Sequence, residues 1–233
     1  MCTVTFVPTS TNVIITSNRD EQESRAAAAP TQYTVNDQVL YFPKDPKAGG
    51  TWFAVTSGGS AAVLLNGASE RHVPKPPYRK SRGLIVLDIL SADSSADYWT
   101  HIDLDKIEPF TLILFDKTLS QLRWDGLQKH HVALDHESSY IWSSFTLYPI
   151  EIIRHREACF ETFLQSQLNL DQSALLQFHS APGNEHTHEG FVIERHFLKT
   201  ISITQAAIAG AETNFFHKDL ISGVESAIHI FHR

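Results

Sequence analysis

The sequence is poor in cysteine and in charged residues, and it lacks a long hydrophobic run. Its two cysteines, Cys2 and Cys159, could form at most one disulfide bond, whereas chains that depend on disulfides usually carry many and are short. We therefore expect a protein of a reducing compartment, the cytoplasm. The apolar run at 84–90 is far shorter than the roughly 20 residues of a membrane-spanning helix. Residues 1–8 have neither the basic flank nor the cleavage site of a secretory signal, so the sequence predicts no membrane span and no secretion.

Positive charge is also scarce. The chain has 19 lysines and arginines against 26 aspartates and glutamates, a net charge of -7 at pH 7. Proteins that bind nucleic acid by neutralising phosphates usually have the opposite sign, so we expect no nucleic-acid partner. Hydrophobic residues make up 42% of the chain, which excludes a disordered or collagen-like protein. No repeat, low-complexity tract or linker divides the sequence, so we expect one domain over residues 1–233.

Both ends of the sequence show the pattern of β-strands. Residues 2–7 and 12–17 are rich in Val, Ile and Thr and flank a short turn, which predicts an N-terminal hairpin. The segment Ser57-Gly58-Gly59 predicts a second hairpin. The predicted strands lie at 2–7, 12–17, 39–42, 51–56, 60–65, 110–115, 119–124, 130–134, 140–145, 191–195, 200–206, 212–217 and 226–231.

Four helices are expected between these strands. Residues 81–92 begin with a capping residue, Ser81, and residues 150–167 repeat apolar side chains at helical spacing. Shorter helices are predicted at 96–104 and 172–178. Strands at both ends with helices between them suggest two sheets packed on each other and covered by helices. The pattern alone supports the α+β class.

Cys2 is the most informative single residue. If Met1 is removed, Cys2 carries a thiol and a free α-amino group, so that one residue supplies both a nucleophile and a base. An unperturbed α-amine has a pKa of about 7.7–8.0, so part of it is neutral at pH 7 and accepts a thiol proton. The alternative is that Cys2 is a small buried residue of the first strand. The position of Cys2 leaves both alternatives open.

The string Asn18-Arg19-Asp20-Glu21 follows the second predicted strand directly. A turn there would bring its side chains back towards Cys2. An arginine near the sulfur favours the thiolate, and a carboxylate could hold the α-amino group. The alternative is a local turn with a surface ion pair between Arg19 and Glu21.

Several motifs in this order and spacing resemble the NRDE family, which includes the transport and Golgi organisation proteins. The likeness covers nearly the whole chain. The motifs are Met1-Cys2-Thr3, Asn18-Arg19-Asp20-Glu21, Gly49-Gly50-Thr51-Trp52, Leu65-Asn66-Gly67, residues 76–83, Arg123-Trp124-Asp125-Gly126, Ile141-Trp142-Ser143-Ser144 and residues 200–205.

This family in turn resembles the N-terminal-nucleophile (Ntn) hydrolases of the penicillin acylase and bile-salt hydrolase kind. The resemblance implies a four-layer αββα sandwich, which agrees with the strand and helix pattern. It also implies that the mature chain starts with a nucleophilic cysteine, here Cys2. Arg19 and Asp20 match the arginine and aspartate that follow the first hairpin in those enzymes, although the enzymes usually separate the two by two residues.

Amide hydrolysis also needs hydrogen-bond donors for the oxyanion of the tetrahedral intermediate. Asn66 is the candidate donor, and its alternative role is to form a turn before Gly67. The resemblance implies a second asparagine near residues 140–144, where this chain has Ser144, whose hydroxyl also donates but over a shorter reach. The late arginine of those enzymes has no clear counterpart, and Lys199 is not equated with it.

A basic stretch and one tryptophan are candidates for ligand binding. We expect Arg79 and Arg82, with Asn18 and Trp52, to contact a ligand. An anionic ligand group would balance the basic stretch, and the acidic remainder of the protein is the alternative. For Trp52 the alternative is a core position. The stretch places five positive charges in twelve residues: Arg71, Lys75, Arg79, Lys80 and Arg82.

Three histidines and two glutamates lie close together late in the sequence. No cysteine pair or recognisable zinc spacing accompanies them, so we expect no metal site. No glycine-rich loop of the nucleotide-binding kind is present either, and no cofactor is expected. The residues are His179, Glu185, His186, His188 and Glu189.

Two functions follow from these observations. The first is a hydrolase of a non-peptide C–N amide bond in a small-molecule substrate, with Cys2 as nucleophile. The second is a non-catalytic protein on the same scaffold, which binds or transfers an apolar anionic ligand such as haem or an acyl thioester and resembles what is proposed for eukaryotic relatives. A trafficking module is a weaker third option, because no docking segment is recognisable. The substrate, the removal of Met1 and the oligomeric state are not determined by the sequence.

Overall fold

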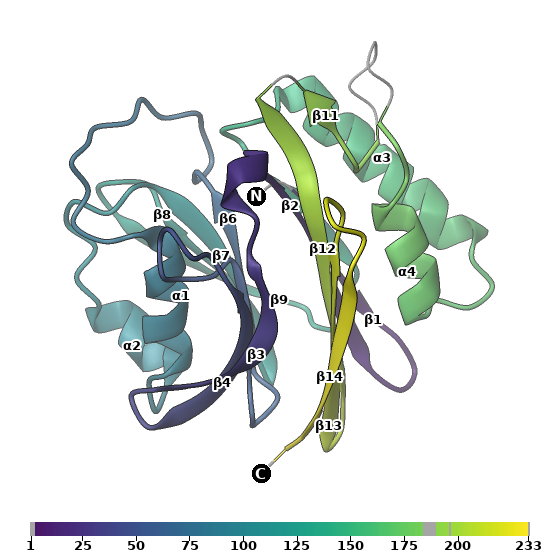
Figure 1. Ribbon diagram of the computed structural model, residues 1–233, viewed down its shortest axis with the longest axis horizontal. Helices are drawn as coiled ribbons and strands as arrows, with labels where there is room; N and C mark the ends of the chain where they lie inside the picture. Colours follow the sequence, from purple (N-terminus) through teal and green to yellow (C-terminus); the bar gives the residue numbers. More distant parts are fainter. Residues whose placement is uncertain (1–2, 184–189, 196, 233) are drawn as a thin grey trace.

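The computed structural model describes residues 3–183, 190–195 and 197–232, and its strands form two antiparallel sheets. The sheets pack face to face in the middle of the molecule, and one pair of helices covers the outer face of each sheet (Figure 1). The layers therefore run helix, sheet, sheet, helix. The α+β class and the four-layer αββα sandwich predicted from the sequence are confirmed.

The first sheet combines strands from both ends of the described chain. Its strands are β1 (Thr3–Pro8), β2 (Val13–Glu21), β10 (Tyr140–Ser143), β11 (Glu194–Arg195), β12 (Leu198–Ala209), β13 (Glu212–Asp219) and β14 (Glu225–Phe231). Their order is β10-β1-β2-β12-β13-β14, with β11 paired to β12. The start of β1 has a partner on each side, because Thr3 pairs with Asn18 of β2 and with Ser143 of β10.

The second sheet is a simple meander. Its strands follow the chain in order, with β3 at one edge and β9 at the other. They are β3 (Ala28–Val35), β4 (Gln38–Lys44), β5 (Phe53–Thr56), β6 (Ala61–Asn66), β7 (Phe110–Asp116), β8 (Thr118–Trp124) and β9 (Lys129–Leu134).

The helices lie in two pairs on the outside of the sandwich. Figure 1 shows α1 (Arg82–Leu90) and α2 (Ser95–His101) against the second sheet, and α3 (Ile150–Ser166) and α4 (Gln172–His179) against the first. Ser81 caps α1 by accepting a hydrogen bond from the Gly83 N–H, as the sequence predicts. No helix within the described ranges has the length and apolar content needed to cross a membrane.

The main core lies between the two sheets. Val4 and Phe6 of the first sheet face the second, and the rings of Phe53 and Phe215 meet across the interface at 5.4 Å between centroids. A smaller core, which includes Val7 and other apolar side chains, lies between the first sheet and α3 and α4. The first sheet is therefore buried on both faces, which is the setting of the polar residues discussed below.

Several predictions of individual strands were wrong. The sequence analysis missed β3, whose side chains are mostly exposed and therefore lack the expected alternation. The predicted strand at 140–145 exists as β10 over its first four residues, but the sequence analysis did not show that β10 joins the first sheet and pairs with β1. Of the segment 191–195, which was predicted as a strand, only Glu194–Arg195 (β11) forms one. Pairing with a distant segment decided the position of β10 only, because β3 pairs with its neighbour β4 and β11 with its neighbour β12.

The position of Asn18-Arg19-Asp20-Glu21 is the correction that matters most for function. We predicted a turn after the second strand, but these four residues are the last part of β2 itself. They remain in the strand because β12 pairs with them as far as Glu21 and Lys199. The first three are buried, so the string forms a polar row inside the sheet.

Two glycine-containing motifs meet through their backbones. A Cβ atom on Gly50 would lie 2.4 Å from the Gly83 carbonyl carbon, and one on Gly83 would lie 2.8 Å from the Thr51 oxygen. The Thr51 N–H also donates to the Gly83 oxygen at 3.2 Å. These contacts explain the glycine at position 50 of the Gly49-Gly50-Thr51-Trp52 motif, and they fix the start of α1 against the chain that leads into β5.

Gly50→Ala should destabilise the protein by about 1–3 kcal/mol, because the added methyl group overlaps backbone atoms that have no free rotamer to adopt. The control is Gly58→Ala at an exposed turn, where the nearest atom to the new Cβ is Thr56 Oγ1 at 3.7 Å; this change should stay within about 0.5 kcal/mol of the wild type. Urea denaturation of both variants measures the difference. Equal stabilities would contradict the close approach.

A buried histidine joins the first sheet to α4. His179 accepts or donates through both ring nitrogens, at 2.8 Å from Thr5 Oγ1 and 2.6 Å from Asn18 Oδ1. Complete burial, with a smaller contribution from the charge of Arg156, lowers its pKa from 6.5 to about 3. Burial also lowers the pKa of His217, which contacts Thr204, to about 4. Both histidines are therefore neutral in the folded protein at neutral pH.

These two histidines should make stability fall as the pH decreases. In the unfolded chain they gain protons near pH 6.5, whereas in the folded protein they do so only near pH 3–4, so the stability present above pH 6.5 is lost progressively below it. Between pH 7.5 and pH 5 each should cost about 2 kcal/mol. His179→Gln should roughly halve this loss, and His101→Gln on exposed α2 should not change it. Urea denaturation at both pH values is the measurement, and an unchanged loss in His179→Gln would contradict the assignment.

Candidate functional site

A small polar cavity lies where the end of β2 meets the start of α1. Its volume is about 110 Å³. Three of its wall residues, Arg19, Asn66 and Arg82, were candidates from the sequence, and Trp52 is a fourth. The four come from β2, β6, α1 and the segment before β5, so only the folded chain brings them together. Glu21, Arg25 and Asp45 are the other charged residues of its wall.

Arg19 is held rigidly in this wall. Its side chain is 3% exposed, Nη2 lies 2.8 Å from Asp45 Oδ2, and Nη1 donates to the Arg25 carbonyl oxygen at 2.7 Å. The guanidinium carbon lies 4.3 Å from the centre of the Trp52 ring, a cation–π distance. Burial lowers the pKa of Arg19, and the neighbouring charge of Asp45 opposes this shift. Arg19 is thus a fixed positive charge at the end of β2.

Asp45 was not identified from the sequence, yet it organises the cavity. It accepts hydrogen bonds from the N–H groups of Lys47 and Ala48, both at 3.0 Å, and pairs with Arg19 and Arg25. Burial alone would raise the pKa of Asp45, but the Ala48 hydrogen bond and the two arginine charges outweigh it and hold the pKa below its usual value. The Asp45-Pro46 turn was the only local signal, and a turn does not reveal a distant arginine.

Two residues of the wall carry hydrogen-bond donors that no described residue satisfies. Trp52 is 2% exposed, and its indole N–H has no partner within the described ranges. The side-chain amide of half-buried Asn66 likewise makes no hydrogen bond to any residue that the structure describes. Buried donors normally find partners, so unsatisfied ones at a cavity are available to a ligand or to water.

Ser144 lies next to Asn66 and supports its backbone. The Ser144 hydroxyl is 2.7 Å from the Asn66 carbonyl oxygen, to which it donates, and 3.0 Å from Thr146 Oγ1. Gly67, the residue after Asn66, has φ +82°, and Thr146 lies where its side chain would be. This left-handed conformation explains the glycine of the Leu65-Asn66-Gly67 motif. Ser144 and Gly67 together hold Asn66 at the end of β6.

Asn18 and Asp20 point to the opposite face of the sheet from Arg19, because successive strand residues alternate. Asp20 accepts hydrogen bonds from Tyr148 Oη at 2.8 Å and Thr200 Oγ1 at 2.5 Å. Asn18 donates to the carbonyl oxygens of His179 and Phe191, at 3.0 and 2.6 Å. Both therefore face α3 and α4. Neither lines the polar cavity.

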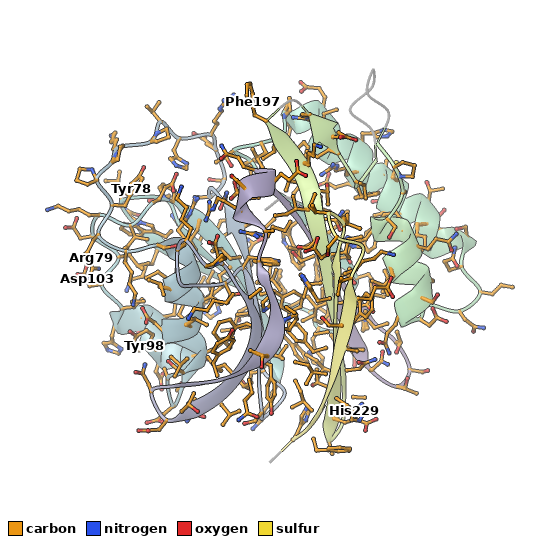
Figure 2. All side chains as sticks on the ribbon, viewed as in Figure 1. Tyr78, Arg79, Tyr98, Asp103, Phe197 and His229 are labelled. Carbon is orange, nitrogen blue, oxygen red and sulfur yellow. The ribbon has the colours of Figure 1, made fainter. Side chains whose placement is uncertain are left out.

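The basic stretch is largely balanced by the protein's own acids. Arg82 pairs with Glu108 at 2.9 Å, and Lys80 pairs with Asp88. Arg79 pairs with Asp103 at 3.1 Å, and Figure 2 shows both at the outer margin of the molecule beside the layer of α1 and α2. Of the two predicted ligand-binding arginines, only Arg82 lies at the polar cavity.

Cys2 lies outside the described residues, and the first residue that the structure describes is Thr3. The backbone of Thr3 pairs with Asn18, the residue before Arg19, and with Ser143, the residue before Ser144. Its hydroxyl accepts a hydrogen bond from Arg156 Nη1 at 2.6 Å. The start of β1 thus lies beside Asn18, which the sequence analysis selected, and is one residue away along the paired strands from Arg19 and Ser144.

A larger and more apolar cavity, of about 540 Å³, lies between the segment after β10 and the start of α3. Phe145, Leu147 and Ile152 form its apolar wall. Arg71 and Arg195 also line it, and within the described ranges neither arginine has an acidic partner. The ring of Tyr148, whose hydroxyl contacts Asp20, connects this apolar cavity to the end of β2. The sequence analysis did not identify this site.

The late histidine group does not form a metal site among the described residues. His179 is the last residue of α4 and is buried, whereas His186, His188, Glu185 and Glu189 lie outside the described ranges. No group of three or more potential metal ligands occurs in the part of the chain that the structure describes.

The fold is similar to that of solved Ntn hydrolases. The Caenorhabditis elegans ortholog of N-acylethanolamine-hydrolyzing acid amidase superposes with a TM-score of 0.61 at 11% identity, over 88% of this chain and 92% of that chain. A single-residue variant of conjugated bile acid hydrolase from Clostridium perfringens gives a TM-score of 0.60 at 10% identity, over 97% of this chain and 92% of that chain.

At these identities the likeness concerns the fold alone. No curated protein matches the sequence. The sequence profile of the Transport and Golgi organisation 2 family matches residues 1–205, which include the motifs noted above and every candidate site residue. The remaining strands, β13 and β14, complete the first sheet. The chain belongs to the Transport and Golgi organisation 2 family.

Proposed function

We propose that this protein is a hydrolase of a non-peptide C–N amide bond, with Cys2 as its N-terminal nucleophile after removal of Met1. The observation that carries the proposal is that Arg19 and Asn66 line one polar cavity at the end of β2, the strand whose Asn18 pairs with Thr3 at the start of β1, on a fold similar to that of amide-hydrolysing enzymes. Asp20 lies on the opposite face of the same strand. The covalent link from Cys2 to Thr3, which pairs with Asn18, supports a reaction at Cys2 near these residues.

The steps of amide hydrolysis follow from the chemistry of an N-terminal cysteine. The Cys2 sulfur attacks the amide carbonyl carbon, and the α-amino group accepts the thiol proton and passes it to the leaving nitrogen as the C–N bond breaks. The product is an acyl thioester on Cys2 and a free amine. Water, deprotonated by the same α-amino group, then releases the acid.

The neighbouring residues have separate roles. The fixed charge of Arg19 favours the thiolate, and Asp20 orients the α-amino group from the other face of the sheet. Asn66 donates to the oxyanion through its side-chain amide, which bonds to no residue that the structure describes, and Ser144 holds the Asn66 backbone in place. The polar cavity, at about 110 Å³, is large enough for the reacting group only. The bulk of a substrate must therefore lie outside it.

Cys2→Ala should abolish hydrolysis of a panel of fluorogenic acyl amides, and Asn66→Ala should lower kcat by about 10²–10³-fold, because the oxyanion loses a charge-assisted donor. Ser144→Ala should cost about tenfold or less, since its hydroxyl acts through Asn66. Intact-mass measurement of quenched wild type should show one acyl group added to a chain that starts at Cys2.

Cys159→Ala is the matched control for the thiol. Cys159 lies on α3 and contacts His155, so its replacement should leave turnover and acyl transfer unchanged. Turnover that survives Cys2→Ala would contradict the assignment of the nucleophile. Absence of both turnover and acyl adduct in correctly processed wild type would contradict the hydrolase itself.

We also consider a binding or transfer function for an apolar anionic ligand, because the apolar cavity favours it. Its volume of about 540 Å³ is within the range of small-molecule sites. Arg71 and Arg195 provide positive charge beside an apolar wall, and a buried guanidinium Nε of Arg195 has no hydrogen-bond partner among the described residues. An amphiphile with one anionic end matches this arrangement.

Under this second function, 11-(dansylamino)undecanoic acid should bind wild type and Cys2→Ala equally, because the thiol plays no part. Arg195→Gln should weaken binding by about tenfold through loss of a charge-assisted contact. Arg154→Gln removes the same charge from an exposed position on α3 and should have no effect. Fluorescence titration is the measurement, and equal affinity in Arg195→Gln and wild type would contradict the site.

A further inference from the structure

The wall of the apolar cavity continues onto the surface of the molecule. Ile150, the first residue of α3, lines the cavity and is 44% exposed. Phe145, Leu147 and Ile152 of the same wall are half-buried. The cavity is therefore not a sealed part of the core, and its apolar side chains are in contact with solvent.

Two further exposed apolar side chains lie next to residues of this wall. Phe197 is 78% exposed and lies in the connection between β11 and β12, next to the pair formed by Arg195 and Leu198. Figure 2 shows Phe197 at the upper margin of the molecule. Val73 is 77% exposed and follows Arg71 by two positions. Both Arg71 and Arg195 line the cavity, and two residues of chain span less than about 8 Å.

The grouping of these side chains distinguishes them from other exposed apolar residues. Single exposed apolar side chains are common on proteins, whereas a group of them marks an interaction surface. Val73, Ile150 and Phe197 come from three separate segments: the loop before α1, the start of α3 and the β11–β12 connection. We call these three residues, together with Arg71 and Arg195, the rim of the apolar cavity.

The rim is positively charged on a protein that is otherwise acidic. Arg71 and Arg195 make no ion pair or side-chain hydrogen bond to any residue that the structure describes. With Glu70, the one acid of the wall, they give it a charge of +1, whereas the remainder of the chain carries -8. Exposed Glu151 offsets part of this positive charge, and exposed Lys75, which has no acidic partner in the described structure, adds to it.

We propose that the rim docks the protein on an anionic lipid bilayer, from which the apolar cavity takes up its ligand. Val73, Ile150 and Phe197 enter the boundary between headgroups and acyl chains, and the two arginines contact the anionic groups of the lipids. The inference rests on the second proposed function insofar as an apolar anionic ligand occupies the cavity.

A bilayer suits the rim better than a protein partner does. A ligand with an apolar body and one anionic end partitions into membranes, so a cavity that opens towards the bilayer receives it without passage through water. A folded protein seated on the rim would instead close the cavity. Arginine side chains also bury their apolar stems while the charged end stays among polar headgroups, which matches their place beside exposed apolar residues.

The test is flotation of the full chain with lipid vesicles. Vesicles of phosphatidylcholine with about 30% phosphatidylserine should carry the wild type to the lipid layer. Phe197→Ser should lower the partition coefficient by about tenfold and Val73→Ser by about threefold, because less apolar surface is buried in the bilayer. Arg195→Gln should lower it by about fivefold on these vesicles and leave it unchanged on pure phosphatidylcholine, which has no net charge.

Phe231→Ser is the matched control for Phe197→Ser. Phe231 is 70% exposed and ends β14, next to the C-terminus, which Figure 1 shows at the opposite end of the molecule from β11. Its replacement removes the same ring and should leave partitioning unchanged. A wild type that stays out of the lipid layer would overturn the proposal. Equal partition of the wild type and Phe197→Ser, or a loss in Phe231→Ser as large as that in Phe197→Ser, would overturn it as well.

The docking surface and the ligand site can fail separately. Wild type that floats with vesicles as predicted but does not bind 11-(dansylamino)undecanoic acid would refute the second function and leave the docking surface in place. Binding of this probe by a protein that does not float would refute the docking surface alone. Neither measurement depends on amide turnover, so the proposed hydrolase is tested independently of both.

Discussion

The pairing of β1 on both of its edges is the constraint on which the rest of the site depends. Thr3 pairs with Asn18 on one side and Ser143 on the other, so the start of β1 is held between two strands that each continue into candidate site residues. Arg19 and Asp20 follow Asn18, and Ser144 follows Ser143. If β1 were an edge strand, one of these two groups of residues would not be next to Thr3.

The alternation of strand side chains then distributes chemistry over the two faces of this sheet. Arg19 points between the sheets, towards Asp45 and Trp52, whereas Asn18 and Asp20 point towards α3 and α4. Three adjacent residues thus contribute to two different environments. Between the sheets, Arg19 pairs with Asp45; on the helix-facing side, Asp20 contacts Tyr148, whose ring lies beside Arg156. Arg19, Asn18 and Asp20 form their side-chain hydrogen bonds mainly with residues far away in the chain rather than within local turns.

The two cavities also differ in polarity, so they suit different parts of a ligand. The polar cavity is small and rich in paired charges, while the apolar cavity is about five times larger and has arginines without acidic partners in the described structure. Tyr148 connects them, because its hydroxyl contacts Asp20 and its ring lies beside Arg156 and Arg195. A ligand with a polar reacting group and an apolar body fits this division on physical grounds.

The sequence by itself determined the class of fold, most helices and strands, the hairpin at Ser57-Gly58-Gly59 and the candidate residues Arg19, Trp52, Asn66 and Arg82 of the polar cavity. Those features depend on local periodicity, on turn chemistry or on recognisable motifs. Tertiary structure alone decided that Asn18 to Glu21 belong to β2, that β10 joins the first sheet, and that Asp45, Tyr148 and Arg156 contribute. These outcomes depend on pairing and charge compensation between residues far apart in the chain, and no local pattern encodes which distant partner a buried polar side chain will find.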